Sequence, residues 1–268
     1  KTLRRLAGDD PSVNEEWNCD KGRWAFKYVT ALDRLTHPLV RNAEGELVQA
    51  SWPEALAAAA AGLKGKRAAV LTGGRVTTED AYGYSKFARI ALGTNDIDYR
   101  ARATSDEERD FLAAHVAGSS TTYRDIDTAD HVALVAFEPE EESPIVFLRL
   151  NKNFKKRGLK VSAVATKGSI AMDKLKADFI KVAPGAESAA VAGLALTAKS
   201  VILVGERASE SAGLFTSVAA LAAKTGAKVA YIPRRAGERG ALEAGALGNV
   251  LPGGRPVTDA AARVDIAA

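Results

Sequence analysis

Short apolar runs alternate with helix-length segments over most of this 268-residue chain. The runs are rich in β-branched residues and have the length of buried strands, which we predict at residues 131–137, 159–164, 179–182, 200–204 and 228–232. Strands separated by helix-length segments indicate βαβ units. The pattern therefore predicts an α/β fold in which a parallel sheet carries helices on both faces.

The predicted helices have recognisable end signals. Residues 51–54 (SWPE) combine a capping-box pair with proline at the first helical position, which predicts a helix from there to Gly62. Ser143 and Pro144 predict the start of a second helix, and Gly158 its end. By the same signals we expect helices over residues 78–93, from about residue 187, and over residues 210–224.

A further apolar run, residues 67–71, is expected to be a buried strand that ends in a turn at Gly73 and Gly74. Such a turn can present backbone N–H groups to a phosphate, or it can simply connect a strand to a helix. The sequence contains neither a G-x-G-x-x-G nor a G-x-x-x-x-G-K-[ST] stretch. The dinucleotide and P-loop fingerprints are therefore not met.

Composition excludes several classes of function. With 47% hydrophobic residues the chain can bury a substantial core. The net charge is +4, and the densest group of basic residues lies within residues 152–157, at the end of a predicted helix. Cations at this end of a helix interact favourably with its dipole. We therefore expect no nucleic-acid partner. No apolar run approaches the roughly 18 to 20 residues of a membrane span, and no signal peptide opens the chain. We expect a reducing, cytoplasmic environment and membrane contact only through partners.

The single cysteine, Cys19, lies in a polar turn among charged and aromatic residues. It cannot form an internal disulfide, so it is a buried small residue, a reactive thiol, or one ligand of a metal site with partners elsewhere. Lys21 and Arg23 would favour a thiolate, and backbone N–H groups near Gly22 could donate to cluster sulfurs. These neighbours favour the metal-ligand interpretation.

Residues 17–23 (WNCDKGR), followed by 33–35 (DRL) and 38–41 (PLVR), resemble the fourth-cysteine segment of the molybdopterin oxidoreductase superfamily. Within it they are most similar to the large iron–sulfur subunit of bacterial respiratory complex I, NADH–quinone oxidoreductase. The resemblance implies that Cys19 is the fourth ligand of a [4Fe–4S] cluster. A cubane cluster takes four ligands, so the other three are expected upstream, in a longer polypeptide.

The same resemblance implies a domain division and a set of partners. It extends to residues 137–150 and 233–242, which look most like actinobacterial versions of this subunit. Residues 1–50 are expected to end a small β-rich iron–sulfur module, and residues 51–268 to form a molybdopterin-oxidoreductase-like α/β domain that is incomplete at its C-terminus. The implied assembly passes electrons from NADH to quinone and pumps protons. NADH and FMN would bind partner subunits of its peripheral arm, at the cytoplasmic face of the plasma membrane.

Residues 93–102 (GTNDIDYRAR) are similar to the segment that precedes the molybdenum ligand in catalytic members of the superfamily. By this alignment Thr104 falls at the metal position and Ser105 at the position of a following histidine, and neither residue type matches. Ser105 could still bind a metal, since serine is a ligand in some relatives. Residues 105–108 (SDEE) also form a capping box, and we expect Ser105 to begin a helix.

A second departure concerns the anionic pterin nucleotide. Catalytic relatives place D-P-R after the strand where this chain has residues 165–167 (ATK). Four glutamates, at positions 138, 140, 141 and 142, are expected at the mouth of the sheet, where they would repel a pyrophosphate. We therefore expect a scaffold without molybdopterin and without a catalytic site of its own. The alternatives are a catalytic enzyme such as a formate dehydrogenase, with Ser105 on the metal, and a free-standing ligand-binding module without a redox role.

The remaining candidates are weaker. The arginines of residues 233–242 (PRRAGERGAL) could bind an anion, or could pair with Glu238 and nearby backbone. His37, His115 and His131 lie far apart in sequence and show no pattern of a nucleophilic triad, although His37 could lie near a cluster. We expect Met172 and the scattered aromatic residues in the core.

Overall fold

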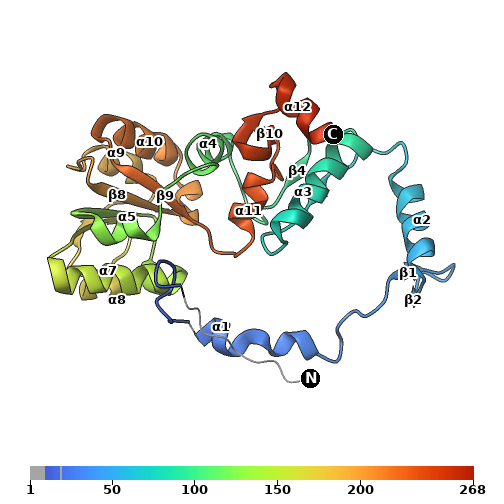
Figure 1. Ribbon diagram of the computed structural model, residues 1–268, viewed down its shortest axis with the longest axis horizontal. Coiled ribbons are helices and arrows are strands. Elements are labelled where there is room, and N and C mark those ends of the chain that lie inside the picture. Colours follow the sequence, from blue (N-terminus) through green and yellow to red (C-terminus); the bar gives the residue numbers. More distant parts are fainter. Residues whose placement is uncertain (1–9, 19) are drawn as a thin grey trace.

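The structure, a computed structural model, describes residues 10–18 and 20–268. The chain forms three parts, shown in Figure 1: an arm (described residues 10–66), a small lobe (residues 67–102 and 236–268) and a sheet body (residues 103–235). The sheet body is thus inserted between the two halves of the small lobe. The arm curves away from both and meets the sheet body again near α7.

The sheet body contains the predicted parallel sheet. Its five strands lie in the order β7-β6-β5-β8-β9, and all neighbours are parallel. In register, Leu134 of the central strand lies opposite Ala163 and Leu203. The strands are β5 (His131–Val135), β6 (Lys160–Ala165), β7 (Asp178–Lys181), β8 (Ser200–Gly205) and β9 (Lys228–Ile232). The five predicted strands are confirmed, with ends shifted by one or two residues.

Helices cover both faces of this sheet, as the pattern predicts. Alternate residues of β5 point to opposite faces, so that Val132 and Leu134 pack with one set of helices, and Ala133 and Val135 with the other. The first set is α5 (Tyr123–Thr128), α7 (Pro144–Arg157) and α8 (Ile170–Lys174). The second is α4 (Asp106–Phe111), its π-helical continuation η3 (Leu112–Val116), α9 (Glu187–Ala192) and α10 (Leu214–Thr225). Short turns α6 (Pro139–Glu142) and η4 (Glu206–Glu210) follow β5 and β8.

The small lobe is built around a second, two-stranded parallel sheet of β3 (Val70–Leu71) and β4 (Ile97–Asp98). The prediction of a buried strand over residues 67–71 is wrong in two respects. The strand is shorter, residues 70–71, and it is not buried, since Leu71 is 79% exposed. This strand has one neighbour, so its other side lacks the cover of a larger sheet. The other elements are α3 (Thr78–Lys86) with π-helical η2 (Phe87–Ala91), α11 (Glu238–Glu243), β10 (Val250–Leu251), η5 (Pro252–Gly254), β11 (Arg255–Pro256) and α12 (Ala260–Ala267).

The glycine turn after β3 is covered by the start of α11. Gly237 donates its N–H to the carbonyl oxygen of Gly74 at 2.9 Å, and a Cβ on Gly237 would lie 2.4 Å from the carbonyl oxygen of Val76. A Cβ on Gly74 would lie 2.7 Å from Cγ of Glu238. Glycine is required here because two backbone segments touch. The turn therefore packs the lobe together, which supports the structural alternative over a phosphate site.

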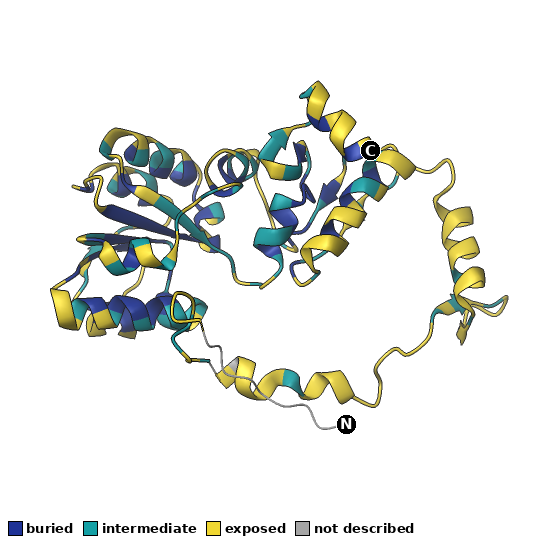
Figure 2. Ribbon diagram, in the orientation of Figure 1, coloured by how far each residue is buried: buried dark blue, intermediate teal, exposed yellow. Residues whose placement is uncertain are grey.

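The arm is extended and largely exposed, as Figure 2 shows. Among its described residues it holds helix α1 (Asp20–Trp24), the 3₁₀ helix η1 (Ala25–Thr30), a hairpin of β1 (Leu39–Arg41) and β2 (Leu47–Gln49), and helix α2 (Trp52–Leu63) with the predicted capping box. The hairpin agrees with the β-rich expectation, but residues 20–30 are helical. None of the described residues between 20 and 73 is buried.

The expectation that Met172 and the aromatic residues lie in the core holds in part. Met172 is 5% exposed, and Phe111, Phe137 and Phe215 are buried. Trp17, Trp24 and Trp52 are each more than half exposed, because they lie on the arm, which has no core of its own in the described residues. No helix in the described part of the chain combines the length and apolar character needed to cross a bilayer.

Candidate functional site

Cys19, the candidate cluster ligand, lies outside the described residues, but its neighbours on both sides are described. Residues 10–17 form turns against α7, and α1 begins at Asp20. Arg23 of α1 reaches back to Asn18, with Nη2 2.9 Å from Oδ1. Among the described residues, no three His, Cys, Asp or Glu side chains form a group that could hold a metal ion.

Thr104 and Ser105 lie where the chain passes from the small lobe into the sheet body. Thr104 is exposed, in an open hollow that Arg100, Asp106 and Arg109 also line. The Ser105 hydroxyl accepts the N–H of Glu108 at 3.1 Å and so caps α4. This confirms the predicted helix start, and it gives the Ser105 oxygen a partner that has nothing to do with a metal.

The acids that follow Ser105 also have structural partners. Glu107 accepts the N–H groups of Gly213 and Thr216, both at 2.8 Å, and so binds the N-terminus of α10. Burial works to raise the pKa of Glu107, but these hydrogen bonds hold it below its ordinary value. The capping-box pattern predicted the Ser105 cap, but not this second cap, because its donors lie more than a hundred positions away.

Glu108 belongs to a buried network of alternating charges. Its side chain is fully buried and accepts from Arg100 at 2.9 Å and from Arg102. Nε of Arg102 lies 2.8 Å from Oε1 of Glu206, and that carboxylate contacts Arg235, which also donates to Glu238. The network joins the segment after β4 to α4, η4 and the start of α11. It therefore ties the small lobe to the sheet body at the point where the chain crosses between them.

The glutamates of α6 lie at the carboxyl end of the sheet, as expected, but two of them are paired. Glu142 contacts Arg207 at 2.9 Å and Arg234 at 3.1 Å, and Glu140 contacts Lys174. The carboxylate of Glu138 accepts the N–H of Glu141. Arginine charge here is thus matched by carboxylates of the same chain.

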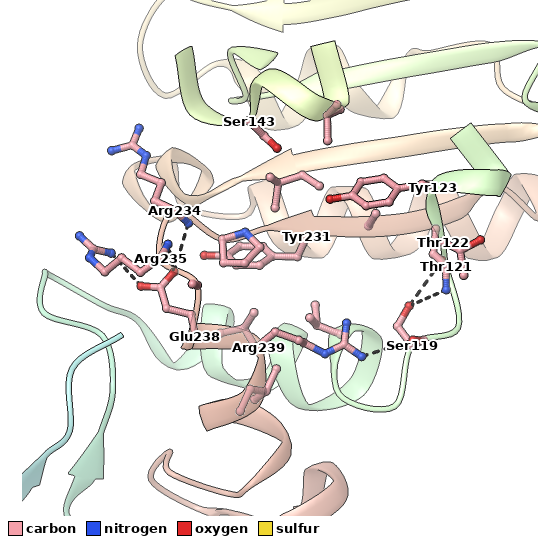
Figure 3. A pocket seen from close by; sticks show the side chains of 18 of the residues that line it. Ser119, Thr121, Thr122, Tyr123, Ser143, Tyr231, Arg234, Arg235, Glu238 and Arg239 are labelled. Atoms are coloured by element: carbon pink, nitrogen blue, oxygen red, sulfur yellow. Dashed lines mark hydrogen bonds and ion pairs between the residues drawn. The ribbon is translucent and has the colours of Figure 1, made fainter. Parts of the chain in front are cut away.

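A cavity of about 410 Å³ lies beside the edge strand β9, between α5 and α11, and is shown in Figure 3. Tyr231 points into it, and burial raises the pKa of this phenol far above its ordinary value, so the hydroxyl stays protonated. At one end Arg235 is paired with Glu238, and at the other Arg239 donates to the Ser119 carbonyl. The arginine-rich segment therefore follows the structural alternative, since its arginines bind glutamates and backbone.

The three histidines do not come together. His37 is exposed beside Thr36, and His115 is exposed with its ring 5.3 Å from that of Phe111. His131 lies at the amino end of β5, with Nε2 2.8 Å from Oγ of Ser162. Their separation on different elements agrees with the absence of a triad pattern.

Comparison with known proteins identifies the family. The model of the molybdopterin oxidoreductase family matches residues 34–247, most of the chain. The chain belongs to the molybdopterin oxidoreductase family. It is 54% identical to the G subunit of NADH-quinone oxidoreductase from Mycobacterium tuberculosis and 53% identical to that from Streptomyces coelicolor, in both cases over the whole chain. It spans about a third, 35% and 36%, of the length of these relatives. The F420-dependent formate dehydrogenase subunit alpha of Methanocaldococcus jannaschii is 29% identical over 70% of this chain and 28% of its own length.

Catalytic molybdopterin oxidoreductases imply a pterin cofactor, and the described residues do not fit one. In open parallel sheets ligands bind outside the carboxyl ends of the strands, where the strand order reverses, here between β5 and β8. These ends are in contact, since a Cβ on Gly205 would lie 2.4 Å from the carbonyl oxygen of Ala136. The adjoining hollow of about 250 Å³ is lined by Glu187 and Glu210, and its Arg207 is bound to Glu142. Carboxylates thus line the place where an anionic nucleotide would bind, and the arginine there is already paired.

An iron–sulfur cluster takes four ligands, and this chain contains one cysteine. The sequence singles out Cys19 as a candidate ligand but does not indicate which side chains hold the residues that precede it. Arg149 and Lys152 of α7 contact residues 11–15, whereas sequence patterns place them only in a predicted helix and its basic end. Their partners lie more than 130 positions away, so no local pattern indicates the contact.

Proposed function

We propose that this chain is part of the large iron–sulfur subunit of a proton-pumping NADH–quinone oxidoreductase, respiratory complex I. The observation that carries the proposal is identity of 53–54% over the whole chain to two G subunits of NADH-quinone oxidoreductases. The whole assembly would pass electrons from NADH to quinone. NADH and FMN would bind other peripheral-arm subunits, and the chain would reach the cytoplasmic face of the membrane only through that assembly.

Within this subunit, we propose that Cys19 is one ligand of a [4Fe–4S] cluster whose other ligands precede Lys1. Residues 1–50 would end the iron–sulfur module, and residues 51–268 would belong to the molybdopterin-oxidoreductase-like domain. The run of residues 17–23 supports this assignment, because it resembles the family segment around the fourth cysteine. A thiolate is the protein ligand that such clusters take.

We further propose that the molybdopterin-oxidoreductase-like domain serves as a scaffold without molybdopterin. Residues near the expected pterin site already have structural partners. Ser105 caps α4, and Glu108 and Glu206 bind Arg102. Glu142 binds Arg207 and Arg234 at the mouth of the sheet. These groups hold the two parts of the chain together. A pterin nucleotide in the same place would have to break these ion pairs between arginines and glutamates of the chain.

The test of the ligand role is Cys19→Ser in the intact subunit, assembled in its complex. We expect one [4Fe–4S] signal to disappear from the EPR spectrum of the reduced complex, while the others remain. His115→Gln, an exposed change in the sheet body, is the matched control and should leave all signals in place. An unchanged spectrum of the Cys19→Ser complex would refute the ligand role.

The second candidate is a catalytic molybdopterin enzyme, which the similarity to a formate dehydrogenase subunit favours. Elemental analysis of the purified complex separates the two. The scaffold role predicts iron without molybdenum or tungsten, whereas either of these metals at one per subunit would establish the catalytic alternative.

A further inference from the structure

Arg149 of α7 binds the arm by its backbone. Its Nη2 donates to three consecutive carbonyl oxygens, those of Pro11 at 3.2 Å, Ser12 at 3.0 Å and Val13 at 2.7 Å. Arg149 is only 4% exposed, so these charge-assisted bonds are shielded from water. Three carbonyls converging on one buried guanidinium fix the path of this segment.

The guanidinium is itself held in place by the sheet body. Nη1 pairs with Asp127 of α5, and Asn153 donates to the other oxygen of that carboxylate at 3.0 Å. The guanidinium also lies over the ring of Tyr123, 4.8 Å from its centroid. These contacts hold the guanidinium in one orientation, in which Nη2 of Arg149 faces the arm.

A second contact follows directly along the chain. Lys152 lies one helical turn after Arg149, and its Nζ is 2.7 Å from both carboxylate oxygens of Glu15. Glu15 and Glu16 have φ of 49° and 71°, which residues other than glycine rarely adopt. A left-handed pair of this kind persists where surrounding contacts hold it.

These contacts form the polar link between the arm and the rest of the described chain. Between described residues 10–66 and residues 67–268, the hydrogen bonds are donated by Arg149 and Lys152. At the same place Trp17 lines, together with Ile145 and Leu148, a cavity of about 210 Å³. The segment just before Cys19 is thus attached to the sheet body at α7.

We propose that Arg149 is a positioning residue for the iron–sulfur site: it fixes residues 11–13, which precede Cys19, against the sheet body. The inference rests on the proposed function, in that it takes Cys19 as a cluster ligand. Cys19 follows Val13 by six positions, so a change in this attachment alters the surroundings of the cluster and leaves its ligand in place. Cluster potential depends on hydrogen bonding and solvent exposure.

The test uses Arg149→Gln and, on the same helix, the exposed Lys155→Gln as matched control, both in the assembled complex. For Arg149→Gln we expect cleavage within residues 10–18 to become at least about tenfold faster in limited proteolysis, since the charge-assisted bonds that oppose local opening are lost. We also expect the EPR signal assigned to Cys19 to remain, with a shifted midpoint in a redox titration. Arg149→Lys, which keeps a cationic donor, should recover part of both effects.

Cleavage and midpoint equal to those of Lys155→Gln would overturn the proposal. If the Arg149→Gln protein does not accumulate, the same proteolysis experiment is done with Lys152→Gln. Lys152 is exposed, so this change leaves the core intact. It should speed cleavage about two- to fivefold, given the weaker exposed pair, and no change in cleavage would count against the attachment. The two proposals fail separately: an unchanged spectrum in Cys19→Ser removes the ligand role, whereas the proteolysis result concerns the attachment alone.

Discussion

Arg102 binds the carboxylate of Glu108 through both of its terminal nitrogens, and Glu108 has no exposed surface. The remaining nitrogen of Arg102 lies 2.8 Å from Glu206, which is 4% exposed. One arginine therefore compensates two buried carboxylates that belong to different elements, α4 and η4. Removing one member of such a buried network is costly, because the carboxylates left behind have no water and only one arginine each, Arg100 for Glu108 and Arg235 for Glu206.

We predict that Arg102→Leu lowers the free energy of unfolding by about 2 to 3 kcal/mol. This is less than the roughly 3 to 5 kcal/mol of a buried charge left without any partner, because Glu108 keeps Arg100 and Glu206 keeps Arg235. Chemical denaturation followed by circular dichroism measures the change. Arg255→Leu is the matched control: its pair with Asp265 is partly exposed, so its loss should cost under about 1 kcal/mol. Equal losses in the two variants would show that the network does not stabilise the junction.

For Ser105 the cap and the metal-ligand interpretations predict different results. Ser105→Ala removes the acceptor for the Glu108 N–H and should lower the free energy of unfolding by about 1 kcal/mol. Ser105→Asp retains a capping oxygen and should restore most of that loss. Iron content and EPR spectra of the assembled complex should match the wild type in both. A loss of bound metal in the alanine variant, without loss of stability, would contradict the capping role.

His131 should make stability depend on pH. Burial, with Lys160 nearby, lowers the pKa of His131 below its ordinary value of 6.5. The unfolded chain then binds a proton more readily than the folded one, so this stabilising contribution is present above about pH 6.5 and declines as pH falls through the lowered pKa. Melting temperatures between about pH 7.5 and pH 5.5 measure the decline.

His131→Gln should flatten part of that decline, because glutamine keeps a polar contact with Ser162 but does not titrate. His115→Gln, at an exposed position, is the control and should leave the profile unchanged. A profile in His131→Gln identical to the wild type would show that His131 is not the group responsible.

The sheet and the starts of α2, α3, α4, α7 and α9 could be predicted because their signals are local. Apolar runs bounded by turn residues indicate the five strands, and the caps at Ser51 and Ser105 are set by residues three positions apart. Helix α10 begins at Leu214 and not at residue 210, where it was expected, because Gly213 has a left-handed φ of 77° that ends the preceding turn. Helix α8 was missed, since five residues carry too little periodicity to be seen.

The site was harder to predict, because its important contacts join distant parts of the chain. Residues 105–108 predict only the start of a helix, whereas in the structure Glu107 also binds the N-terminus of α10 and Glu108 binds two arginines. The exposure of Leu71 and of the arm tryptophans was likewise missed, since periodicity shows that a segment is apolar but not whether anything covers it. The importance of Cys19 rests on the family resemblance of its segment, because a single thiol has no spacing pattern of its own.

The insertion of the sheet body into the small lobe has a consequence for how the chain comes apart. Both connecting segments belong to the same ion network: Arg102 lies on the segment that enters the sheet body, Arg235 on the segment that leaves it, and each contacts Glu206. One continuous apolar cluster also includes Ala81 and Leu242 of the lobe and Val204 of the sheet. If a protease cut the chain within residues 233–237, the two fragments would therefore stay associated. They would separate only when denaturant unfolds the lobe and the sheet body in one step.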